Sequence, residues 1–128
     1  ITTVPGASGW FVGGVIAYAN DVKTNMLGVD TSLFDTSGPG AVSEECAKQM
    51  ASGCRQRCES DYALAITGIA GPEGGSEEKP VGTVFIGLAS RHNVSARKFM
   101  LGTERETIRA RAVYAALEML RREILDIT

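Results

Sequence analysis

The stretch YALAITGIAGPEGGSEEKPVGTVFIGLAS, residues 62–90, places a glycine-rich loop between two apolar runs. Residues 62–68 and 82–90 have the length and composition of buried strands. Residues 91–93 can form a tight turn into a further run, 94–101, so a hairpin is expected there. The loop TGIAGPEGG, residues 67–75, is either a turn that holds a ligand or a plain connection between strands. The residues around it decide between these two readings.

The bulk composition limits the classes of protein to consider. The chain has 128 residues, of which 44% are hydrophobic and 22% charged, as expected for one soluble globular domain. Its formal net charge of −2 provides no basic surface for nucleic acid. No apolar run is long enough to span a membrane, and no signal peptide is recognisable. The sequence therefore predicts a cytoplasmic protein with neither nucleic-acid nor membrane partners.

The three cysteines fall in one helical stretch. Cys54 and Cys58 are four residues apart, which places both thiols on one face of a helix where they could meet a metal. A zinc site needs more ligands, and the one histidine, His92, lies in an expected turn. We therefore expect reduced structural thiols and no metal.

Helices are expected before and after the central stretch. WFVGGVIAY, residues 10–18, predicts a strand buried on both faces, after which Asn20 can cap a short helix that stops at Gly28. Ser43, followed by two glutamates, predicts the start of a helix that runs to about residue 58.

The last helix is the most clearly patterned element. Thr103 and Glu106 have the spacing of a capping box. Apolar residues then recur with helical period at 108, 112, 115 and 119, with others beside them at 113, 117, 120 and 124. Because strands and helices alternate, the sequence predicts an α/β fold with helices packed on a mixed sheet.

Three stretches could carry chemistry, and each has a plainer interpretation. Gly68 and Gly71 would let a ligand approach the backbone, and Thr67 adds a hydroxyl. The loop is neither a Walker A loop, because no G-K-[ST] follows, nor a G-x-G-x-x-G motif. Lys23 lies in the first turn of a helix, where the dipole disfavours a cation by about 0.3–1 kcal/mol. Tyr18 could position that amine. The plainer interpretation is an exposed lysine beside a tyrosine at the sheet rim.

The third stretch is the start of the last helix, GTERETIR at 102–109. Free backbone N–H groups together with Arg105 and Arg109, one turn apart, can receive a phosphate. Solvated arginines that pair with Glu104 and Glu106 are an equally acceptable interpretation of these residues.

Taken together and in this order, these stretches resemble one known family. VPGAS at 4–8, GGVIAYANDVKTNMLGV at 13–29, GAVSEE at 40–45, the block AITGIAGPEGGSEEKPVGTVFIGLA at 65–89, and GTERETIRARAV at 102–113 are similar to the C-terminal domain of competence/damage-inducible protein A. This is the CinA family, whose stand-alone members are nicotinamide-nucleotide amidases (PncC). The resemblance covers residues 1–128, and the block at 65–89 is highly specific.

The resemblance implies a three-layer α/β/α domain with a mixed sheet, generally dimeric or of higher order. It implies hydrolysis of the carboxamide of nicotinamide mononucleotide, in pyridine nucleotide recycling, to nicotinate mononucleotide and ammonia. No cofactor or metal is implied. In longer members, a molybdopterin-binding-like domain with pyrophosphatase activity precedes this one.

The resemblance also assigns residues. Tyr18, Asn20 and Lys23 match the family motif Y-[SA]-N-x-x-K, in which the lysine is the expected base and the tyrosine orients it. Arg105 is expected near the phosphate, and Glu73 to Glu78 should be only a mobile link. The substrate-contacting loop, which can offer backbone donors to an oxyanion or a phosphate, comprises Thr67, Gly68, Ile69, Ala70 and Gly71.

One family feature has no match in this chain. Members carry a strand and helix with an A-E-S-C-T-G-G motif before the V-P-G-A-S segment, and its serine is the proposed nucleophile. The domain at 1–128 is expected to lack that strand and helix, so these residues alone should be inactive and leave a bare sheet edge. The mechanism stays open between an acyl-enzyme and a serine-assisted water. The alternative function is a non-catalytic nucleotide-binding or dimerisation module attached to a larger enzyme.

Overall fold

The computed structural model describes residues 1–126, in which three strands form one antiparallel sheet of order β1-β2-β3. Ala63 pairs with Ala89 at one end of the ladder, and Ala89 pairs on its other side with Val94. The strands predicted from residues 62–101 are thereby confirmed. Both described pairings are antiparallel, so the prediction of a mixed sheet is wrong for the described strands. The strand bounds are β1 Ala63–Gly68, β2 Thr83–Ala89 and β3 Val94–Met100.

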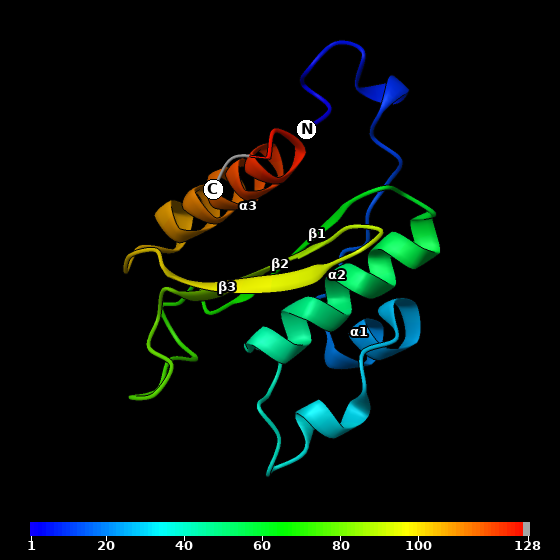
Figure 1. The fold of residues 1–128 in the computed structure, drawn as a ribbon. Coiled ribbons are helices and arrows are strands. Elements are labelled where there is room, and N and C mark those ends of the chain that lie inside the picture. Colours follow the sequence, from blue (N-terminus) through cyan, green and yellow to red (C-terminus); the bar gives the residue numbers. More distant parts are fainter. Residues whose placement is uncertain (127–128) are drawn as a thin grey trace.

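Helices cover both faces of this sheet (Figure 1). Helices α1 (Asn20–Leu27) and α2 (Glu44–Cys58) lie on one face, and α3 (Arg105–Ile124) lies on the other. Because side chains alternate along a strand, β2 contributes to two separate cores. Ala89 packs with the core beneath α1 and α2, whereas Val84, Ile86 and Leu88 pack beneath α3. The predicted three-layer α/β/α architecture is confirmed. Two short 3-10 helices complete the fold, η1 at Ala7–Gly9 and η2 at Thr31–Phe34.

The helix boundaries follow the predicted signals in two cases and differ in two others. The Ser43 hydroxyl accepts a hydrogen bond from the amide of Cys46 and so caps α2. Gly28 ends α1 with a left-handed backbone conformation, at φ 71°. Asn20, however, is the first helical residue of α1, which starts from Ala19 without a side-chain cap. Likewise α3 starts from Glu104 without a side-chain cap, so the capping box predicted at Thr103 does not form.

Residues 10–18 do not form the strand that their composition predicts. Residues 12–17 make no backbone hydrogen bond to any part of the chain that the structure describes, and a strand requires a paired ladder. The segment is also not buried on both faces. Val15 and Ala17 pack against the core near α2, whereas Val12, Ile16 and Tyr18 on the alternate face are exposed, Ile16 by 93%. The apolar run is therefore an extended segment with one covered face.

Two glycines bring α2 into backbone contact with its neighbours. A Cβ on Gly53 of α2 would overlap the backbone carbonyl of Leu27 at the end of α1. A Cβ on Gly87 of β2 would overlap the carbonyl of Ala47 in α2. Any larger residue at these positions would push the elements apart, so the α1–α2 and α2–sheet distances are set by the main chain.

Helix α3 buries a narrower face than its pattern predicts. The buried positions include Ala116, where Ala115 was expected, and Val113, Leu117 and Ile124 on the flanking face are exposed. No helix within residues 1–126 is long and apolar enough to cross a membrane.

Candidate active site

Lys23 is a buried cationic side chain that projects from the first turn of α1. It is 6% exposed, and its Nζ donates one hydrogen bond, of 3.1 Å, to the backbone oxygen of Tyr18. Tyr18 itself is 85% exposed, so its main chain, not its phenol, holds the amine. The alternative of an exposed surface lysine is therefore wrong, and Tyr18 lies beside Lys23 as the sequence pattern suggested.

The charge of the buried amine acts on a thiol in the first turn of α2. Burial raises the pKa of the Cys46 thiol, and the positive charge of Lys23 opposes part of that increase. The amide of Cys46 is capped by Ser43, so the thiol that feels this charge belongs to the capped first turn of α2. All three cysteines are free, and the pKa of Cys54 is raised by burial and by the neighbouring Cys58. The expected placement of those two thiols on one helix face is confirmed.

Thr67 ends the buried part of β1 and turns its hydroxyl toward the main chain. Its Oγ1 donates a 2.7 Å hydrogen bond to the carbonyl of Ala41, in the loop before α2. Because that bond uses the hydroxyl hydrogen, Thr67 can only accept a hydrogen bond from a ligand. Thr67 is 6% exposed, so a ligand could bond to its hydroxyl only by coming into direct contact with the loop.

In the loop after β1, some backbone amides donate a hydrogen bond and others do not. The amide of Ile69 donates to the carbonyl of Thr83, and the carbonyl of Ile69 accepts from the amide of Gly82. Both polar groups of Ile69 therefore bond to the start of β2 and the residue before it. The amides of Ala70 and Gly71 have no hydrogen-bond partner within residues 1–126. Gly71 adopts φ 76° and is buried, a conformation that favours glycine. Two adjacent free N–H groups can stabilise an oxyanion or a phosphate oxygen.

The start of α3 meets this loop. Arg105 donates from Nη1 to the carbonyl of Gly71 at 2.8 Å, which ties the helix to the loop. A hollow of about 570 Å³ lies alongside, and Gly68, Ala70, Glu106 and Arg109 contribute to its lining. Within the described chain, neither arginine forms an ion pair with Glu104 or Glu106. Of the two, Arg109 lines the hollow.

The predicted site residues therefore form two groups. Tyr18 and Lys23 belong to one, while the loop 67–71 and Arg105 belong to the other. Asn20 is exposed on α1, and no hydrogen bond joins the two groups within residues 1–126. Sequence reasoning missed Lys79, whose Nζ donates to the carbonyl of Pro39 at 2.6 Å. The K-P-V-G run beside the glycine loop was the available signal for it.

Comparison with known proteins identifies the family. A sequence profile described as "CinA C-terminal domain" matches residues 1–124. A CinA-like protein of Geobacter metallireducens is 49% identical over 126 residues, and one of Rippkaea orientalis is 47% identical over 128 residues. Each alignment covers 98% of this chain and 30% of the relative. The chain thus spans about a third of the length of these curated relatives.

Solved structures agree with this assignment. The competence/damage inducible protein CihA of Agrobacterium tumefaciens superposes with a TM-score of 0.88 at 45% identity, covering 93% of this chain and 72% of that one. The competence damage-inducible protein A (ComA) of Klebsiella pneumoniae gives a TM-score of 0.89 at 30% identity, covering 97% and 76%. The α/β architecture and the sequence match therefore point the same way, and the chain belongs to the CinA C-terminal domain family.

Proposed function

We propose that this domain is the amidase part of a nicotinamide-nucleotide amidase, which hydrolyses nicotinamide mononucleotide to nicotinate mononucleotide and ammonia. The observation that carries the proposal is the burial of Lys23 with a single backbone acceptor. A buried lysine amine with so little hydrogen bonding costs stability, which favours a chemical role for it. Family membership supports the same reaction class.

In this proposal Lys23 acts as the general base. Once deprotonated, the amine takes the proton of a serine hydroxyl, and the serine oxygen, or a water that it activates, attacks the carboxamide carbon. The C–N bond then breaks, and the proton passes to the departing nitrogen to give ammonia. Where the serine itself attacked, a water then hydrolyses the acyl-serine ester, which releases nicotinate mononucleotide and restores the serine hydroxyl. Tyr18 orients the amine through its carbonyl oxygen. No metal or cofactor takes part in these steps.

The substrate would lie against the loop after β1. The free amides of Ala70 and Gly71 are the donors proposed for the developing oxyanion or for a phosphate oxygen. Arg105 holds this loop through the Gly71 carbonyl, and Arg109 supplies a cation at the neighbouring hollow. We assign Thr67, Gly68 and Ile69 to the wall of the loop, and Asn20, exposed on α1, to the edge of the site.

The serine is proposed to come from a strand and helix of a longer protein, outside residues 1–128. Residues 12–17 make no backbone hydrogen bonds within the described chain, and β1 pairs with a strand along one edge only. A strand carrying the nucleophile could pair with either, which would bring a serine toward the Lys23 amine. A homodimer and a preceding molybdopterin-binding-like domain belong to the same proposal.

The test measures ammonia released from nicotinamide mononucleotide. The full-length protein should release it, and the isolated 128-residue chain should not. Lys23→Ala in the full-length protein should abolish release, whereas the matched variant Lys98→Ala, on exposed β3, should retain it. Turnover by the isolated chain would refute an external nucleophile, and an active Lys23→Ala variant would refute the assigned base.

A second candidate is a non-catalytic module that binds a nucleotide or serves in dimerisation. The exposed apolar residues of the extended segment favour it, because such residues are usual at interfaces. Calorimetric titration with nicotinamide and nicotinate mononucleotides separates the candidates. Binding without turnover by the full-length protein would indicate a ligand module, and absence of binding would indicate a dimerisation unit.

A further inference from the structure

Three consecutive backbone carbonyls before α2 each accept a hydrogen bond from a different side chain. The oxygen of Pro39 accepts from Lys79 Nζ at 2.6 Å, that of Gly40 from Ser43 Oγ at 2.7 Å, and that of Ala41 from Thr67 Oγ1 at 2.7 Å. We call residues 39–41 the carbonyl row. Its donors come from the loop before β2, the cap of α2 and the end of β1, so three elements meet there.

We propose that Lys79 is a positioning residue for the substrate loop 67–71 and acts on it through the carbonyl row. The inference rests on the proposed function, since it assigns a task to a residue outside the loop itself. Lys79 would hold the loop in a binding-competent shape without touching the substrate.

The connectivity supports this role. Thr67 ties the start of segment 67–79 to the row, and Lys79 ties its end to the same row two residues away. Between them, the Gly71 carbonyl is fixed by Arg105. Residues 72–78 are exposed, but a turn closes them, since the amide of Ser76 donates to the carbonyl of Lys79 and the Ser76 hydroxyl accepts the Lys79 amide. The segment is therefore fastened at both ends and at Gly71, and its last four residues form a hydrogen-bonded turn.

The chemistry of the row explains why a lysine matters there. A hydrogen bond from an ammonium to a carbonyl is charge-assisted and stronger than one between neutral groups. Lys79 is half-buried, so solvent screens the contact only in part. With the row held in place, the Ala41 oxygen keeps the hydroxyl hydrogen of Thr67 and leaves its lone pairs free. Thr67 would then accept a hydrogen bond from a donor group of the substrate, such as a carboxamide NH₂ or a ribose hydroxyl.

The test compares Lys79→Met, Lys79→Arg and Lys98→Met in the full-length protein. Methionine keeps an apolar stem but has no donor, arginine keeps a charged donor, and Lys98 is an exposed lysine of β3. Hydrogen exchange of the hydrogen-bonded amides in 39–41 and 67–71, which include those of Gly40 and Ile69, is measured without substrate. The kcat and KM for nicotinamide mononucleotide are measured separately. Lys79→Met should speed exchange in both segments roughly tenfold and raise KM roughly tenfold, with kcat within about twofold of wild type.

The control and rescue variants complete the design. Lys98→Met should leave exchange and kinetics unchanged, and Lys79→Arg should restore much of the wild-type KM. Faster exchange confined to residues 72–82, or an unchanged KM in active Lys79→Met enzyme, would overturn the proposal. If the wild-type protein shows no turnover, the proposed function fails on its own. Exchange then still decides whether Lys79 holds the loop, because that readout needs no substrate.

Discussion

The Nζ of Lys23 lies 3.1 Å from the backbone oxygen of Tyr18, while the Tyr18 side chain projects into solvent. The hydrogen bond that fixes the amine is therefore independent of the side chain at position 18. The amine can therefore be removed by a substitution at Lys23, and the phenol by one at Tyr18, each without altering the other residue. Stability and turnover can then be measured separately for each group.

Replacing Lys23 by Met should remove turnover without unfolding the domain. The methionine fills most of the volume of the buried stem, and it removes an amine that has one acceptor, so the melting temperature should stay constant or rise slightly. Tyr18→Phe should also leave the melting temperature unchanged, because the phenol is exposed. Calorimetric melting checks both. A Lys23→Met protein that melts many degrees lower would show that the lysine is structural.

Replacing Gly53 by Ala should destabilise the domain although alanine is the better helix former. The propensity gain is about 1 kcal/mol at most. The new Cβ would overlap the Leu27 carbonyl, a backbone atom that cannot rotate away, and overpacking of this kind costs typically 1–3 kcal/mol or more.

We expect a net loss of about 1–2 kcal/mol, or roughly 3–8 °C in melting temperature. Gln56→Ala, on the exposed side of the same helix, is the control and should change stability by less than about 0.5 kcal/mol. A Gly53→Ala variant more stable than wild type would contradict the close approach of α1 and α2.

A charge on the extended segment should destabilise the fold at one position and leave its stability unchanged at the next. Val15→Asp places a carboxylate against the core near α2 and should cost about 2–4 kcal/mol. Ile16→Asp lies on the exposed face and should leave the melting temperature unchanged while it reduces binding of a hydrophobic dye by the 128-residue chain. Equal melting temperatures for the two variants would mean that the segment is not oriented as described.

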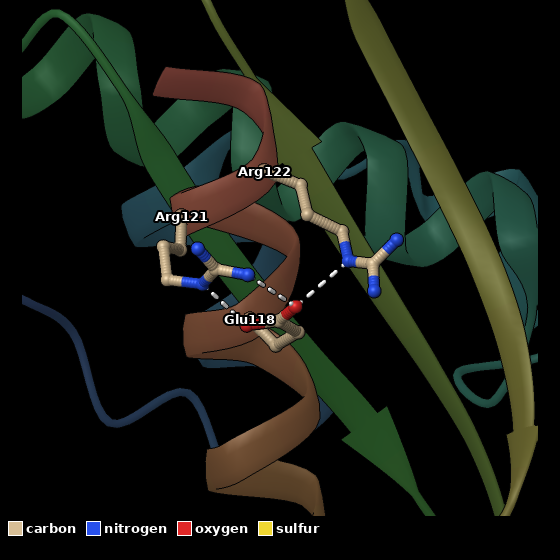
Figure 2. A network of polar contacts seen from close by, with 3 residues as sticks. All are labelled: Glu118, Arg121 and Arg122. Carbon is tan, nitrogen blue, oxygen red and sulfur yellow. Dashed lines mark hydrogen bonds and ion pairs between the residues drawn. The ribbon is translucent and has the colours of Figure 1, made fainter. Parts of the chain in front are cut away.

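The ionic cluster on α3 should stabilise the fold only above acidic pH. Figure 2 shows Glu118 bonded to Arg121 and Arg122, at 2.7 Å from the Nε of each. These hydrogen bonds lower the pKa of Glu118 from 4.5 to about 2. A depressed carboxylate pKa contributes stability that is complete above the unfolded value and is lost as the pH falls from about 4.5 toward 2.

The difference in melting temperature between wild type and Glu118→Gln measures this contribution. It should be small at pH 7, because the groups are exposed, and should shrink in 1 M salt. It should disappear near pH 2. A difference that grows on acidification would contradict the assigned contacts.

Much of the fold could be predicted from local signals. The Ser43 cap with its two glutamates, the Gly28 stop and the apolar runs at 62–68, 82–90 and 94–101 each specify a boundary through nearby atoms, and each was confirmed. The capping box at Thr103 failed because spacing alone does not fix the backbone: Gly102 has φ 121° and the helix begins only at Arg105.

The errors share a dependence on partners distant in the sequence. The composition of residues 10–18 is that of a strand, but strand formation needs a neighbour with which to pair, and no described backbone group provides one. Lys23 could be proposed as a site residue, yet its burial depends on α2 and its neighbours. The Lys79–Pro39 bond joins residues forty positions apart. The K-P-V-G run draws attention to Lys79, but no local pattern predicts that Pro39 is its partner.

The glycine contacts of α2 have a consequence for how the domain can vary. Gly53 places α2 against the main chain of α1, and Gly87 places the sheet against the main chain of α2. At these two points the sheet, α2 and α1 are in direct main-chain contact, with no side chain between them. These contacts set the distance from the sheet to α1, which carries Lys23. Core side chains can be substituted during evolution without changing that distance. The position of Lys23 relative to the sheet can therefore be retained while the surrounding sequence changes.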